Sequence, residues 1–94
     1  MDFETEKQKI TKLSGKQLVS ANILGIHAGT TGPQGGDWGH GSRAYVKLKD
    51  EGGTGWLIRV DGEVFQPTEI EILVGGDSEL ETFKNALFFA AKNV

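Results

Sequence analysis

The residues best suited to chemistry gather in one stretch, "GIHAGTTGPQGGDWGHGSRAY", which runs from Gly25 to Tyr45. It holds both histidines of the chain, one of its two arginines and one of its two tryptophans. Arginine and threonine can bind phosphate oxygens, aspartate can accept from a ribose hydroxyl, and aromatic faces can stack a base. We therefore expect any function of the chain to depend on this segment.

Glycine makes up seven of the seventeen residues from Gly25 to Gly41. Because glycine loses the most backbone freedom on folding, such a run is usually a flexible loop. Here, however, the polar residues are not those of a linker, and a tryptophan lies among them. Glycine-rich backbone can also point successive N–H groups into an anion-binding concavity. We expect a ligand-binding loop, and a purely structural loop is the main alternative.

The expected ligand is a small anion, a nucleotide or a sugar phosphate. Arg43 is the only full positive charge between Lys16 and Lys47, so we expect it to be the ligand's principal charge partner and dispensable for folding. Neither the phosphate-loop motif nor the dinucleotide-binding glycine motif is present. The candidate ligand-binding residues are His27, Thr30, Thr31, Gln34, Gly35, Gly36, Asp37, Trp38, His40, Arg43 and Tyr45.

His27, Asp37 and His40 raise two further hypotheses. Zinc accepts imidazole nitrogen and carboxylate oxygen, but the spacing matches no familiar zinc site. The same residues could perform acid–base chemistry on a serine or threonine hydroxyl nearby. We expect no catalytic residue, no metal and no cofactor, and keep a small histidine-dependent hydrolase as an alternative.

Length and charge narrow the class of protein. The 94 residues are expected to form a single domain, 1–94, with a net charge of −3. Residues 1–49 carry +3 and residues 50–94 carry −6, so no basic field suited to general nucleic-acid binding covers the chain. The acidic half supports a second alternative, a protein–protein inhibitor that uses the loop and an acidic surface.

Cellular location is inferred from three features. The chain has no cysteine, its charged N-terminal stretch lacks the apolar core of a secretory signal, and no apolar run is long enough to cross a bilayer. We therefore expect a cytoplasmic protein with no membrane partner.

The elements that must position the loop are mostly strands. Alternating apolar residues predict strands over 43–50 and 68–74 and a hairpin over 55–65, turning at Asp61-Gly62 with Trp56, Ile58 and Val60 inward. Residues 10–26 are interpreted as two extended segments joined near Ser14-Gly15. Residues 3–13 are interpreted as a strand in preference to a helix. The expected fold is α+β, an antiparallel sheet of four to six strands with one C-terminal helix.

The C-terminal helix is predicted over residues 75–94, with a capping box formed by Ser78 and Glu81. One apolar stripe is suited to packing on the sheet, and it consists of Leu80, Phe83, Leu87, Ala90 and Val94. Phe88 and Phe89 widen this stripe beyond one face. The wide face is interpreted as a broad core contact or as a subunit interface. Because the domain is small, we expect a homo-oligomer.

Residues 26–50, "IHAGTTGPQGGDWGHGSRAYVKLKD", resemble small proteins of phage and bacterial genomes that share an "IHA…TPQGGD.GHG.R" pattern. The helix start "GGDSELETF" is similar to theirs. Some short phage proteins of this size bind host cyclic nucleotide immune signals without cleaving them. The resemblance therefore implies an anti-defence sponge that acts in the host cytoplasm and holds its ligand without turnover.

Overall fold

A computed structural model describes residues 2–37 and 40–94. Its strands are β1 (Leu13–Val19), β2 (Ile23–Thr30), β3 (Arg43–Gly52), β4 (Ile58–Val60), β5 (Glu63–Phe65) and β6 (Glu69–Gly75). Its helices are α1 (Phe3–Lys7) and α2 (Asp77–Asn93). Four strands form an antiparallel sheet in the order β1-β2-β3-β6, and β4 and β5 form a separate pair. The predicted α+β fold with its C-terminal helix is confirmed.

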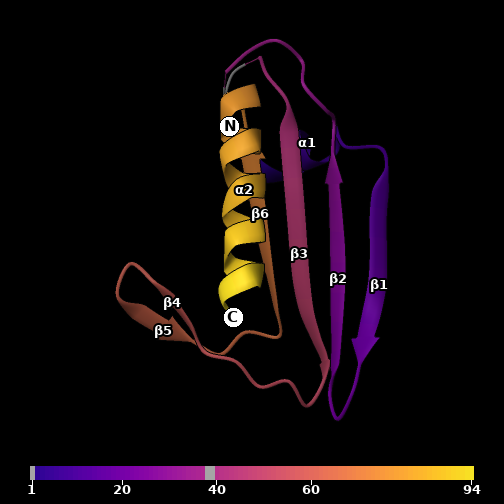
Figure 1. The fold of residues 1–94 in the computed structure, drawn as a ribbon, viewed down its shortest axis with the longest axis vertical. Coiled ribbons are helices and arrows are strands. Elements are labelled where there is room, and N and C mark those ends of the chain that lie inside the picture. Colours follow the sequence, from indigo (N-terminus) through magenta and orange to yellow (C-terminus); the bar gives the residue numbers. More distant parts are fainter. Residues whose placement is uncertain (1, 38–39) are drawn as a thin grey trace.

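The two helices lie on opposite faces of the sheet (Figure 1). Helix α2 contacts β6 and β3, whereas α1 contacts β3 from the other side. The described part of the connection between β2 and β3, residues 31–37 and 40–42, lies at one end of the sheet beside the start of α2. We call it the glycine-rich loop. The β4–β5 hairpin projects from the other end (Figure 1).

The N-terminal strand prediction was wrong, because residues 3–7 form helix α1. Asp2 caps this helix: its carboxylate accepts hydrogen bonds from the Thr5 amide at 3.2 Å and the Thr5 hydroxyl at 2.6 Å. Such a cap satisfies amides that a first turn leaves without partners. As a result, Glu6 and Lys7 lie against the face of the sheet opposite α2.

The predicted junction near Ser14-Gly15 was also wrong. Strand β1 runs through both residues, and the chain reverses at residues 20–22, where the Ser20 amide donates to the Asn22 carbonyl at 2.9 Å. Gly15 lies opposite His27 in the register, and a Cβ at Gly15 would collide with the His27 imidazole. This glycine therefore marks close cross-strand packing rather than a turn.

The predicted capping box does not form at the start of α2. The N-cap is Gly76, at φ 109°, and no side chain caps the helix there. Ser78 is already the second helical residue. The carboxylate of Asp77, the first helical residue, bonds to the glycine-rich loop instead.

The hairpin turn is confirmed, since Asp61 and Gly62 have φ of 49° and 85°, as a type I′ turn requires. The predicted inward alternation is wrong at Val60, which is 53% exposed. Trp56 is half-buried, and its indole N–H donates to the Pro67 carbonyl at 2.6 Å. Because β4 and β5 form a sheet of their own, their apolar side chains have no broad surface to pack against.

The apolar core is small. Within the described residues, the only buried apolar side chains are Ile10, Ala44 and Tyr45. No residue of α2 is buried. None of the helices in the described part of the chain is long and apolar enough to cross a membrane.

Candidate functional site

The first residue of α2 holds the glycine-rich loop. Asp77 Oδ1 accepts hydrogen bonds from the amides of Gln34 and Ser42, each at 3.0 Å, and Oδ2 accepts from the amide of Gly35 at 2.7 Å. These donors, that of Gln34 first, lower the pKa of Asp77 from an ordinary 3.8 to about 2. The loop amides thus converge on an anion, but that anion is a carboxylate of the same chain.

Further hydrogen bonds tie the loop to α2 in both directions. The Asp77 amide donates to the Gly36 carbonyl at 2.9 Å, and the Gly76 amide donates to the Ser42 carbonyl at 2.8 Å. The Ser42 hydroxyl donates to the Gly76 carbonyl at 3.0 Å. A Cβ at Gly41 would collide with the backbone of Gly36. The loop therefore uses glycine for close backbone contact as well as for turns.

Arg43, the predicted charge partner of a ligand, is only 2% exposed. Its Nε donates to Glu6 Oε2 at 3.2 Å, and its Nη1 donates to the carbonyls of Gly41 and Ser42, each at 3.0 Å. Hydrogen bonds from Lys9 and then Arg43 lower the pKa of Glu6. Arg43 thus fastens α1 to the start of β3, which argues against the expectation that it is dispensable for folding.

Tyr45 is also 2% exposed. Its hydroxyl donates to Glu71 Oε2 at 2.5 Å, and Lys7 Nζ lies 2.8 Å from the same oxygen and 4.9 Å from the Tyr45 ring centroid. Burial, followed by the bond to Glu71, raises the pKa of Tyr45. Tyr45 therefore joins α1, β3 and β6 rather than presenting a face on which a base could stack.

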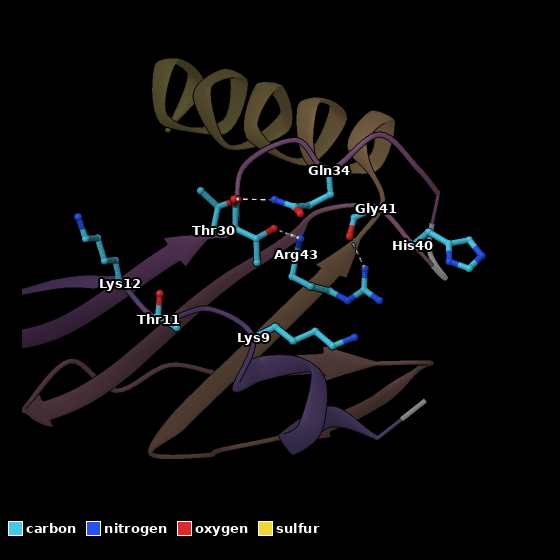
Figure 2. Close-up of a pocket in the computed structure, with 9 residues that line it drawn as sticks. Lys9, Thr11, Lys12, Thr30, Gln34, His40, Gly41 and Arg43 are labelled. Carbon is cyan, nitrogen blue, oxygen red and sulfur yellow. Dashed lines mark hydrogen bonds between the residues drawn. The ribbon is translucent and has the colours of Figure 1, made fainter.

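A cavity of about 570 Å³ lies between the glycine-rich loop and the segment that joins α1 to β1 (Figure 2). We call it the basic cavity, because three of its described lining side chains are cationic and none of the described ones is acidic. Five lining residues belong to the predicted set, and four do not. The lining consists of Lys9, Thr11, Lys12, Thr30, Thr31, Gln34, His40, Gly41 and Arg43.

Three of the four missed residues come from the segment before β1, and the fourth, Gly41, belongs to the glycine-rich loop. Lys9, Thr11 and Lys12 lie across the cavity from Gln34, with Arg43 between them (Figure 2). The net charge of +3 in residues 1–49 was the signal that could have pointed to them. Interpreting residues 3–13 as a strand gave no reason to place this segment beside the loop.

The polar groups of the loop side of the cavity are already partly bonded. The Thr31 hydroxyl oxygen accepts from the Arg43 amide at 2.9 Å, and the Thr30 hydroxyl oxygen accepts from the Gly32 amide at 2.9 Å. The Gln34 side chain donates to the Thr31 carbonyl at 3.2 Å. These bonds fix the loop side, so the lysines opposite are the adaptable part of the lining.

The two lysines differ in their partners. Lys9 Nζ lies 2.6 Å from Glu6 Oε2, with its side chain 51% exposed. Lys12 is exposed, and within residues 2–37 and 40–94 it makes no ion pair. Lys12 is therefore the lining cation whose charge is least compensated.

Several predicted residues lie outside the cavity lining. His27 lies on β2 against Gly15, and Tyr45 lies beneath α1. Gly35, Gly36 and Asp37 belong to the loop without lining the cavity: the Asp37 carbonyl accepts from the amides of His40 at 3.1 Å and Gly41 at 2.5 Å. Trp38 lies outside the described residues.

A metal centre finds no support in the described ranges, which contain no group of three or more histidine, aspartate or glutamate side chains placed to share an ion. No protein-family model, curated protein or solved structure matches this chain.

Proposed function

We propose that the chain is a non-enzymatic binding module that holds a small nucleotide-like anion in the basic cavity. One observation carries the proposal: among the described residues, the lining combines three cationic side chains with hydroxyls and an amide, and it includes no acid. The cavity volume of about 570 Å³ also falls within the range of about 300–1,000 Å³ typical of small-molecule sites.

The charge contacts in this proposal differ from those that the sequence suggested. Asp77 accepts hydrogen bonds from three loop amides, and Arg43 donates hydrogen bonds to Glu6 and to two carbonyls. Lys12 and Lys9 then provide the direct contacts to a phosphate, because an ammonium on a flexible stem can follow a charged oxygen. Arg43 adds to the positive field without needing to leave its partners.

No carboxylate lines the cavity in the part of the chain that the structure describes, which supports binding without turnover. Among the described lining residues, the side chains of types that act as general bases are Lys9, Lys12 and His40, and the His40 ring is directed away from the other labelled side chains (Figure 2). The resemblance to small phage and bacterial proteins favours a cyclic nucleotide immune signal as the ligand. The proposed role is a cytoplasmic sponge for such a signal.

Calorimetric titration with cyclic and linear nucleotides and with inorganic pyrophosphate tests the proposal. Lys12→Ala should weaken binding by about ten- to 150-fold, the equivalent of one hydrogen bond to a charged group. Lys49→Ala is the matched control, because Lys49 is an exposed lysine six residues beyond Arg43 on β3. Its affinity should equal that of the wild type.

Three results would contradict the proposal. Absence of binding to every compound would remove the nucleotide hypothesis. Equal affinity in Lys12→Ala and wild type would place the ligand elsewhere. Chromatography that detects a hydrolysis product of the nucleotide after incubation would favour the hydrolase alternative over the binding module.

A further inference from the structure

Helix α2 covers only part of its face of the sheet. Neighbouring strands lie about 4.8 Å apart and a helix is about 10 Å wide, so a four-stranded sheet has room for about two helices. Helix α2 contacts β6 and β3 (Figure 1). The same face of β2 and β1 extends beyond α2 without a second helix.

An open groove of about 360 Å³ follows the boundary between α2 and this uncovered face. On the sheet its lining includes Ala28 and Val46, and on the helix it includes Lys84 and Leu87. Phe88 follows Lys84 by four residues, so it continues the same flank of the helix. It is 64% exposed. We call this surface the helix groove.

The molecule exposes more surface than its mass requires. Its accessible area is 6603 Å². A compact monomer of 10.2 kDa exposes about 5,300 Å². The excess is larger than the roughly 800 Å² that each partner contributes to a standard protein–protein interface. The radius of gyration, 14.4 Å, likewise exceeds the about 12.4 Å expected for this length.

We propose that a second copy of this chain covers the helix groove in a two-fold dimer. Each copy has one helix and one uncovered half of a sheet face, so each can provide what the other lacks. In such a contact the same surface patch is used by both copies and the assembly closes at two. The α2 helix of the partner copy would lie over β1 and β2, with Phe88 of each copy at the contact. This inference is independent of the ligand proposed above.

Light scattering coupled to size exclusion tests the dimer at high micromolar concentration. The wild type should show twice the 10.2 kDa chain mass. Ala28→Arg and Phe88→Lys, which place charges in the groove and on its flank, should reduce the mass to that of one chain. Leu57→Lys is the matched control: Leu57 is 72% exposed on the segment leading into β4, outside the groove. This variant should remain a dimer.

Circular dichroism establishes that each variant is folded, and Phe88→Lys alone decides the test if Ala28→Arg unfolds. A wild-type monomer or a larger closed assembly would overturn the proposal. So would a dimer that survives a folded groove variant, or one that Leu57→Lys dissociates.

Discussion

The glycine-rich loop and the β4–β5 hairpin lie at opposite ends of the sheet and are built in opposite ways (Figure 1). At the loop end, Asp77 and Arg43 bind backbone groups, and Ser42 is fully buried. At the hairpin end, apolar side chains are exposed: Leu57 at 72% and Val64 at 51%. The comparison shows that hydrogen bonds and one buried ion pair, rather than apolar burial, hold the loop.

The physical reason lies in the loop's composition. Residues rich in glycine carry little apolar surface, so burial contributes little to their stability. Their backbone groups still need partners once they leave water. The structure supplies these partners through the side chains of Asp77 on α2 and Arg43 on β3. Among the described residues, no buried side-chain nitrogen or oxygen lacks a hydrogen-bond partner.

Removing Arg43 should have the largest effect on stability. Arg43→Ala deletes a guanidinium that is 2% exposed and leaves the carbonyls of Gly41 and Ser42 without these donors. Breaking a buried ion pair by removing one partner typically costs about 3–5 kcal/mol. We expect a loss of about 3 kcal/mol in the free energy of unfolding, measured by urea titration at fixed protein concentration.

Arg59→Ala is the control for Arg43→Ala. Arg59 is the other arginine of the chain and is exposed on β4, so its removal should change the free energy of unfolding by less than about 0.5 kcal/mol. If both variants are equally stable, the buried pair does not hold the loop end, and the contrast between the two ends fails.

Asp77→Asn should have the next largest effect. The substitution keeps one acceptor oxygen but presents an NH₂ group to amides that need an acceptor, so at least one of the three bonds is lost. For a domain of this length we expect Tm to fall by roughly 10 °C. Glu79→Gln removes a nearby carboxylate from the same first turn of α2 and should leave Tm close to that of the wild type. An equal fall in both variants would assign the effect to the helix dipole instead of the loop.

The same residue gives the loop end a dependence on acid. The pKa of Asp77 is lowered from 3.8 to about 2 in the folded chain. Its carboxylate therefore contributes its full stabilisation of the fold above pH 3.8, and this stabilisation is lost as the pH falls toward about 2. The difference in Tm between wild type and Asp77→Asn should therefore shrink over that interval. A difference that stays constant in acid would show that the charge of Asp77 does not hold the loop.

Most of the fold could be predicted because it follows from periodicity. The alternation of apolar and polar residues predicted β3 and β6, and the apolar stripe predicted α2. The pair Asp61-Gly62 predicted the hairpin turn. Helix α1 was missed because it has five residues and depends on the cap at Asp2, a local signal that periodicity does not contain. The β1–β2 turn was misplaced because Gly15 serves close packing against His27.

The candidate site was less predictable, because its partners are distant in the sequence. The amide donors of the loop could be inferred from its glycines, but their acceptor, Asp77, lies 43 residues after Gln34. Arg43 was predicted to contact a ligand because it is isolated in the sequence, but in the structure it contacts Glu6, which lies 37 residues earlier. The sequence indicated that the loop amides and Arg43 could bind anions. The tertiary structure shows that these anions include the carboxylates of Asp77 and Glu6.

The smallest effect is expected at the hairpin end. Leu57 is 72% exposed, so Leu57→Ser removes little buried apolar surface. Surface substitutions of this kind change the free energy of unfolding by less than about 0.5 kcal/mol. Urea titration should show this small change, and Ala44→Ser, at a buried position on β3, provides the contrasting loss. If Leu57→Ser destabilises the chain as much as Ala44→Ser does, Leu57 is buried against another surface in solution. The contrast between the two ends of the sheet then fails.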